Sequence, residues 1–158
     1  QTLMALKPGD EVAITPARGK LIMEGIESDS ICMIGGGIGV APFRGILKYA
    51  WDVGLESPNL ILLYCDRNIE ELVFKKELDF YANKFEIKYT LTRELGEWWS
   101  GRRGRINWDM IGPVENIQGG NVTYMICGSV EMVKDTYRLL LDNGIEKGRV
   151  VTELFTGY

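Results

Sequence analysis

The chain has 158 residues, the size of one ordinary domain, and such a domain buries about two-thirds of the surface that its unfolded form exposes. Hydrophobic residues make up 46% and charged residues 25%, which argues against a disordered or fibrous protein. The formal net charge of -4 disfavours general nucleic-acid binding, and no run of about 18 apolar residues predicts a membrane span. With no signal peptide pattern at the start, we expect a cytoplasmic protein.

The spacing of the cysteines and the absence of histidine argue against several kinds of catalytic and metal site. Cys32, Cys65 and Cys127 are widely spaced and lie in or at the end of apolar runs, so they predict neither a zinc site nor a disulfide framework. The chain contains no histidine and therefore has no Ser-His or Cys-His pair for nucleophilic catalysis. Hydrolytic functions are disfavoured, and we expect no metal site.

Residues 1–28 do not begin a unit of strand, helix and strand. The sequence KPGD at residues 7–10 predicts a turn, and residues 11–14 alternate between polar and apolar as a strand does. This segment is either a hairpin added to the next domain or the last strand of a separate β domain. The pattern alone leaves both alternatives open.

From residue 29 onward, short apolar runs alternate with longer amphipathic stretches. The runs predict strands at residues 30–34, 59–64, 86–92, 121–127 and 149–155. The stretches between them predict helices at residues 40–51, 70–83 and 130–143, and a short helical turn at 108–111. This alternation is typical of an α/β fold in which an open parallel sheet carries helices on both faces.

A glycine-rich segment, GGGIGVAPF at residues 35–43, joins the first of these strands to the following helix. Glycines let a diphosphate approach main-chain N–H groups, and a helix N-terminus adds unpaired donors and a favourable dipole. Gly37 and Gly39 fit the first two positions of the dinucleotide fingerprint GxGxxG, whereas Pro42 occupies the third. Proline is tolerated in a first helical turn. The segment favours a nucleotide diphosphate site, and a tight turn without a ligand is the alternative.

Several motifs in order resemble the ferredoxin-NADP reductase family of flavin oxidoreductases. The segment GGGIGVAPFRGIL is similar to the one that opens the nucleotide domain of that family. The further matches are LYCDR at 63–67, ELVF at 71–74 with Glu77 and Leu78, Thr92 with Arg93, GRRGRI at 101–106, and CGS at 127–129 with Met132. The resemblance implies an NAD(P)-binding domain of this family's type.

The resemblance extends upstream of the glycine segment. LKPGD at 6–10 and TPARG at 15–19 look like the closing strand and a loop of the family's β-barrel flavin domain. Residues 1–28 would then be the truncated end of an FAD-binding β domain, and residues 29–158 the NAD(P)-binding domain. The family's R-x-Y-[ST] flavin signature does not occur in this chain. We therefore expect FAD to be bound mainly by a domain upstream.

The resemblance also implies roles for individual residues. The residues implied in binding NAD(P)H are Gly36, Gly37, Gly39, Pro42, Arg44, Asp66, Arg67, Thr92, Arg93, Arg103, Arg105, Gly128, Ser129 and Met132. Cys127 resembles the cysteine that packs beside the nicotinamide, and Glu153 resembles an acidic residue near the flavin, so these two are the catalytic candidates. Phe155 is expected to shield the flavin ring, with Tyr158 as the alternative. For Cys127 and Phe155 the other interpretation is an ordinary core residue.

The nucleotide preference is left open by the residues themselves. The arginines of residues 93–105 favour the 2′-phosphate of NADP, because guanidinium groups form charged hydrogen bonds with phosphate. Asp66 favours a ribose hydroxyl of NAD instead. Either nucleotide is compatible with the sequence.

The implied function is a module that passes hydride from NAD(P)H to FAD. Electrons then continue to a ferredoxin, an iron-sulfur subunit, or a hydrogenase or oxygenase partner. One alternative is a non-catalytic NAD(P)-binding or interaction domain. The other is a flavin-independent Rossmann dehydrogenase, which is disfavoured because the chain lacks a Tyr-x-x-x-Lys pair and a catalytic histidine.

Overall fold

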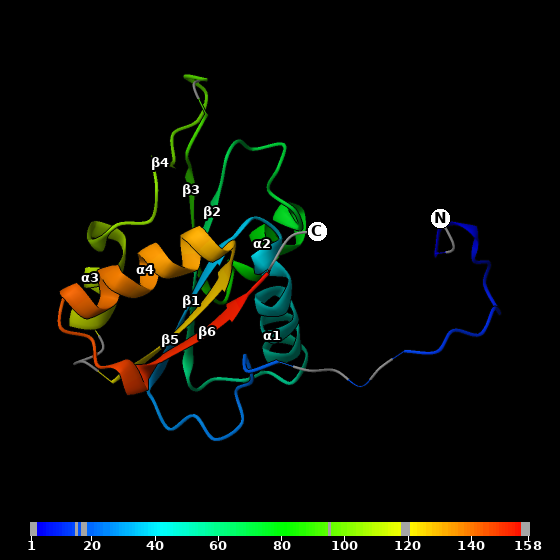
Figure 1. Ribbon diagram of the computed structural model, residues 1–158, viewed down its shortest axis with the longest axis horizontal. Coiled ribbons are helices and arrows are strands. Elements are labelled where there is room, and N and C mark those ends of the chain that lie inside the picture. The colour runs from blue at the N-terminus through cyan, green and yellow to red at the C-terminus, as the bar shows by residue number, and fades with distance from the viewer. Residues whose placement is uncertain (1–2, 15, 17–18, 95, 118–120, 156–158) are drawn as a thin grey trace.

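A computed structural model describes residues 3–14, 16, 19–94, 96–117 and 121–155 of the chain (Figure 1). Its centre is a sheet of parallel strands in the order β4-β3-β2-β1-β5-β6. The strands are β1 (Ser30–Gly36), β2 (Asn59–Asp66), β3 (Glu86–Leu91), β4 (Arg102–Arg103), β5 (Val122–Gly128) and β6 (Val150–Leu154). The predicted open parallel α/β fold is confirmed.

Helices cover both faces of the sheet (Figure 1). They are α1 (Ala41–Asp52), α2 (Lys75–Tyr81), α3 (Trp108–Ile117) and α4 (Val130–Asp142). Alternate residues of β1 face opposite layers: Ile31 and Met33 pack with α1 and α2, whereas Cys32 and Ile34 pack with α3 and α4. Because both faces are covered, the central strands are apolar along their whole length, which is why the sequence shows them as continuous apolar runs.

Two helices differ from the sequence prediction. Helix α2 begins at Lys75 and not at residue 70, because Phe74 adopts a left-handed φ of 60° and Val73 donates its N–H to the Tyr64 hydroxyl at 3.1 Å. These contacts hold the residues before α2 in a loop. Helix α3 continues past Pro113 to Ile117, beyond the predicted single turn, and its apolar side chains join the core under the sheet.

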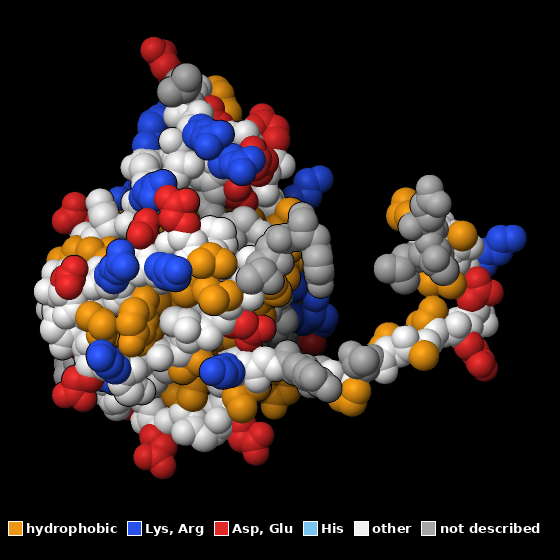
Figure 2. Space-filling view, in the orientation of Figure 1, with side chains coloured by type: hydrophobic (Ala, Val, Ile, Leu, Met, Phe, Trp, Pro, Cys, Tyr) orange, Lys and Arg blue, Asp and Glu red, His pale blue; other side chains and the backbone are white. Residues whose placement is uncertain are grey.

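The strand predicted in the N-terminal segment is absent from the structure. Residues 11–14 form no strand, because the described residues offer them no neighbouring strand to pair with. The segment runs away from the domain, and its hydrophobic side chains stand clear of it (Figures 1 and 2). Met4 is 93% exposed and Ile14 87%. The chain reaches the core at Leu21, which is buried against the α1 and α2 layer. The predicted domain boundary at residue 28 stays a prediction.

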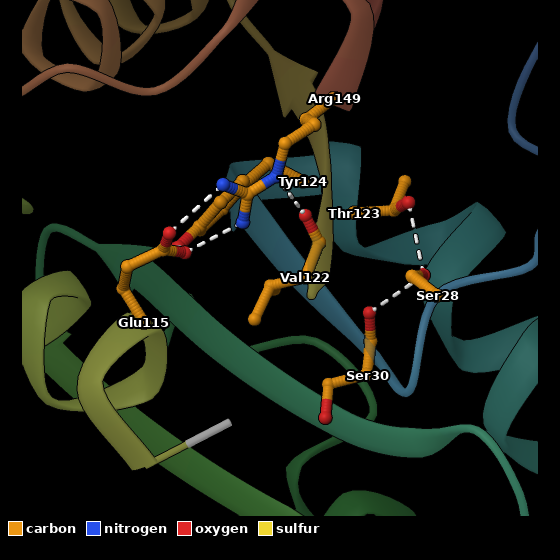
Figure 3. A network of polar contacts seen from close by, with 7 residues as sticks. All are labelled: Ser28, Ser30, Glu115, Val122, Thr123, Tyr124 and Arg149. Carbon is orange, nitrogen blue, oxygen red and sulfur yellow. Dashed lines mark hydrogen bonds and ion pairs between the residues drawn. The ribbon is translucent and has the colours of Figure 1, made fainter. Parts of the chain in front are cut away.

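A polar network fixes β6 beside β5 at the amino end of these strands (Figure 3). The Arg149 guanidinium donates to both carboxylate oxygens of Glu115 at 2.8 and 2.6 Å, and its Nε donates to the Val122 carbonyl at 2.9 Å. The Tyr124 hydroxyl donates to the same carboxylate at 2.8 Å. The two charged side chains are mostly buried, so the two-point pair is protected from solvent. The pair joins α3 to the start of β6, the edge strand of the sheet.

Replacing Glu115 tests this network. Hydrogen bonds from Arg149 and Tyr124 hold the pKa of Glu115 below its ordinary value of 4.5. A lowered folded-state pKa stabilises the fold above pH 4.5, and this stabilisation is lost as pH falls through the folded pKa. We expect Glu115→Gln to lower the free energy of unfolding by about 2 kcal/mol at pH 7 and by less at pH 3.5, measured by urea unfolding.

The matched control is Glu86→Gln, whose carboxylate pairs with Lys88 on the exposed surface. Exposed ion pairs contribute little, so we expect a change below about 0.5 kcal/mol at either pH. Equal losses in the two variants at pH 7 would contradict a stabilising role for the Arg149–Glu115 pair.

Candidate nucleotide-binding site

A cleft of about 680 Å³ lies at the carboxyl ends of the strands. In open α/β sheets, ligands bind at this edge where the strand order reverses, and here β1 lies between β2 and β5 at that point. The predicted nucleotide and flavin residues that line the cleft are Gly36, Gly37, Asp66, Arg67, Thr92, Arg93, Arg105, Gly128, Ser129, Met132 and Phe155. The structure thus brings most of the predicted residues together, from loops far apart in sequence.

The glycine turn is pressed against the end of β5. A Cβ atom placed on Gly39 would lie 2.3 Å from the carbonyl oxygen of Cys127, so only glycine fits at this position. Gly37 has a φ of +54°, a conformation that other residues rarely adopt. Pro42 lies in the first turn of α1, as predicted. The turn therefore brings the main chain of Gly36, Gly37 and Ile38 to the cleft, and α1 follows directly behind it.

The ends of β2 and β3 are joined by hydrogen bonds beside the cleft. Thr92 donates its N–H to the Asp66 carbonyl at 2.9 Å, and Arg93 donates its N–H to the Arg67 carbonyl at 2.7 Å. Burial raises the pKa of Asp66, although the Arg67 N–H and the Tyr64 hydroxyl donate to its carboxylate at 2.9 and 3.2 Å. The Asp66 carboxylate is therefore held in place within the cleft by its own neighbours.

The arginines of the cleft differ in their partners. Arg67 pairs with Glu71 at 3.5 Å. Arg105 pairs with two carboxylates of α4, Glu131 at 3.2 Å and Asp135 at 3.1 Å. Within the described residues, the guanidinium of Arg93 forms no ion pair. Arg93 is thus the cleft arginine that is most available to an anionic ligand.

The catalytic candidates lie side by side on β5 and β6. Cys127 is opposite Glu153 in the strand register, and it directly precedes Gly128, which lines the cleft. Burial, with a smaller effect of Glu153, raises the pKa of the Cys127 thiol to about 11. The thiol is therefore protonated near pH 7, which fits a packing role and not a nucleophilic one. Neither side chain lines the cleft, so both catalytic roles stay predictions.

Segments from near both ends of the chain lie beside Glu153. The Glu153 carboxylate accepts a hydrogen bond from the Lys20 N–H at 3.1 Å. Phe155 lines the cleft, is 38% exposed, and donates its N–H to the Gly128 carbonyl at 3.0 Å. Tyr158, the alternative aromatic, lies outside the described residues, as do residues 15, 17 and 18 of the upstream loop motif.

Four predicted nucleotide-binding residues do not line the cleft. Gly39 and Pro42 lie behind it, in the packing of the glycine turn and α1. Arg44 forms an ion pair with Glu77 at 2.8 Å. Arg103 donates to the main-chain carbonyls of residues 94 and 96 at 3.2 and 2.6 Å. Local partners engage both arginines, and their roles toward the nucleotide stay predictions.

The cleft also contains residues that the sequence prediction missed. They are Ile38, Cys65, Glu71, Ile106, Glu131, Asp135, Thr136 and Leu139. Three of those on α4 lie on the same face as Met132, because residues at i, i+3, i+4 and i+7 share one side of a helix, whereas Glu131 directly precedes Met132. Starting from Met132, that spacing would have found Asp135, Thr136 and Leu139.

Two further findings bear on the kind of site. The described residues contain no group of three His, Cys, Asp or Glu side chains that could hold a metal ion. Within the same residues, no helix is both long and apolar enough to cross a membrane. The cleft has the volume of a small-molecule or cofactor pocket, which is typically about 300–1,000 Å³.

Residues 33–138 match the family described as oxidoreductase NAD-binding domain. The chain belongs to this family. It is 27% identical over 158 residues to NADH-cytochrome b5 reductase 1 of Kluyveromyces lactis, covering 94% of this chain and 54% of the relative. It is also 27% identical over 155 residues to sulfhydrogenase 1 subunit gamma of Pyrococcus furiosus, covering 94% and 52%. The chain thus spans about half the length of these relatives.

A solved structure supports the same assignment. The ferredoxin NADP+ reductase of Neisseria gonorrhoeae with bound FAD and NADP has a TM-score of 0.68 and 26% identity, over 88% of this chain and 61% of that chain. The predicted resemblance to ferredoxin-NADP reductases is therefore confirmed. The match to an oxidoreductase NAD-binding family agrees with a cleft built on a glycine turn.

The contact of Gly39 with β5 gives a direct test of the turn. We expect Gly39→Ala to lower the free energy of unfolding by about 2 kcal/mol, since its new methyl group would overlap main chain that cannot move freely. Gly45→Ala is the matched control, because Gly45 lies within α1 and a Cβ there meets nothing within 4 Å. It should raise the free energy of unfolding by about 0.5–1 kcal/mol. Urea unfolding measures both, and equal effects would contradict the close approach.

Proposed function

We propose that this chain is the NAD(P)H-binding module of a flavin-dependent oxidoreductase. NAD(P)H would supply a hydride, and FAD held mainly by a domain outside this chain would accept it. The observation that carries the proposal is the glycine turn, which is packed against β5 and opens onto a cleft lined by the predicted nucleotide residues. The family match supports the nucleotide. The bound FAD and NADP named for the Neisseria reductase support both cofactors.

The glycine turn and the N-terminus of α4 explain how the cleft would hold a diphosphate. Helix α1 begins directly after the glycine turn, and α4 begins directly after the cleft residues Gly128 and Ser129. The first N–H groups of a helix lack partners within it, and the helix dipole makes that end positive. The Ser129 side chain accepts the Met132 N–H at 3.3 Å and caps α4. The positive end of α4 and the main chain of the glycine turn together favour an anion in the cleft.

The nicotinamide end would lie toward β5 and β6. We assign Cys127 a packing role beside this ring, because its thiol is buried and protonated at the end of β5. Glu153 and Phe155 lie on the same side, and Phe155 presents an aromatic ring to the cleft. Holding the two reacting groups in a fixed orientation accelerates a transfer between them without covalent chemistry by the protein.

The exposed N-terminal segment supports an upstream flavin domain. Val12 and Ile14 are 56% and 87% exposed, and they stand two residues apart, as residues on one face of a strand do. An isolated strand is not stable, whereas the edge of a neighbouring sheet would pair its main chain and cover these side chains. We propose that the part of residues 1–28 that precedes Leu21 completes that domain, since the chain joins the core of the present domain at Leu21. The sequence resemblance to the closing strand of the family's flavin domain supports the same assignment.

We further propose that the electron acceptor is another electron-transfer protein. The relatives are named for cytochrome b5 and for a hydrogenase, and the Neisseria enzyme is named for ferredoxin. A shared nucleotide domain with differently named acceptors indicates that regions outside this domain select the acceptor. A ferredoxin, an iron-sulfur subunit or a cytochrome is compatible with this chain.

The nucleotide proposal is tested by calorimetric titration of the chain with NADPH and with NADH. We expect saturable binding of at least one of them, little changed by added FAD. Gly37→Glu should bind about tenfold more weakly than Gly37→Gln, because only its carboxylate repels the diphosphate. Both variants carry the same strain at the positive φ of residue 37, so their difference isolates the charge. Absence of binding by the folded wild-type chain would exclude the proposed function.

A further inference from the structure

Arg105 is held across the cleft by two carboxylates of α4. Its guanidinium lies 3.2 Å from Glu131 and 3.1 Å from Asp135, and all three residues line the cleft. The two acidic residues are four positions apart on α4, so both reach one guanidinium from the same side of the helix. Arg105 follows β4, far from α4 in sequence. The contact therefore joins two separate walls of the nucleotide cleft.

The charged side chains of the cleft determine which arginines are free to bind an anionic ligand. Three arginines line the cleft, and the carboxylates that line it are Asp66, Glu71, Glu131 and Asp135. Arg67 and Arg105 are neutralised by these carboxylates, and Arg93 has no ion pair within the described residues. A phosphate monoester carries about 1.5–2 negative charges near pH 7. Such a group must compete with Glu131 and Asp135 to reach Arg105.

We propose that Glu131 and Asp135 are specificity-determining residues that reduce the preference of this cleft for a nucleotide with a 2′-phosphate. The inference rests on the proposed function, because it assumes that the cleft binds NAD(P)H. A 2′-phosphate that takes Arg105 leaves two carboxylates unpaired beside it, and these repel the phosphate. A nucleotide with a free 2′-hydroxyl meets no such repulsion. Arg93 still allows NADPH to bind, so the two carboxylates tune the preference.

The test uses two probes that differ only in this group, 2′,5′-ADP and 5′-AMP, titrated into the full chain. In Glu131→Gln/Asp135→Asn we expect the Kd for 2′,5′-ADP to fall about fivefold, because each exposed ion pair is weak and two are removed. The Kd for 5′-AMP should change by less than about twofold. The control is Asp142→Asn/Glu146→Gln, which removes the same charge from exposed positions outside the cleft lining.

Arg105→Gln completes the design as a double-mutant cycle. Without the guanidinium, neutralising Glu131 and Asp135 should relieve repulsion only, so the selectivity gain should shrink to less than about half. An unchanged ratio of the two Kd values in Glu131→Gln/Asp135→Asn would overturn the inference, and so would an equal shift in the control. If the wild-type chain binds neither NADPH nor NADH, the proposed function itself fails and the inference fails with it. Binding of either full nucleotide together with an unchanged ratio overturns the inference alone.

Discussion

The contact between the glycine turn and the main chain of β5 is the constraint on which the site depends. Gly39 approaches the Cys127 carbonyl so closely that no side chain fits there. This approach draws the start of α1 toward the end of β5, where α4 begins. The glycine turn and the N-terminus of α4 then lie at one edge of the sheet, and both line the cleft. The glycine preserves the site through backbone packing, even though it does not itself line the cleft.

The charge pattern of the cleft follows from which loops reach it. The ends of β2 and β3 supply Asp66, Arg67 and Arg93, and the connection after β4 supplies Arg105. The proposed dinucleotide would need positive potential at its phosphates, and the N-terminus of α4 lies beside the cleft to supply part of it. Two of the three cleft arginines, Arg67 and Arg105, form ion pairs with carboxylates that also line the cleft. In the proposed function, the arginines would thus adjust the nucleotide preference, while the main chain would supply the general affinity for a diphosphate.

The sequence predicts most of the fold, because the buried strands are apolar and the helices are periodic. It misplaces the start of α2, since the positive φ of Phe74 depends on a loop held by Tyr64. It gives no sign that Glu77, distant in sequence, forms an ion pair with Arg44, whose predicted role toward the nucleotide stays a prediction. It also misses the carboxylates of α4. Helical spacing from Met132 would have indicated Asp135, but the pairing of that carboxylate with Arg105 depends on tertiary packing and leaves no local signal.

The most direct test of this account is a titration of the isotopically labelled chain with NADP+ and NAD+, followed through its backbone amide resonances. The account predicts that the largest shifts occur at Gly36, Gly37, Gly128 and Ser129, where the glycine turn meets β5. The hollow at the opposite edge of the sheet, near residues 55–61 and 84–86, should remain unchanged. Shifts concentrated at that opposite edge, or none at the glycine turn during saturable binding, would contradict it.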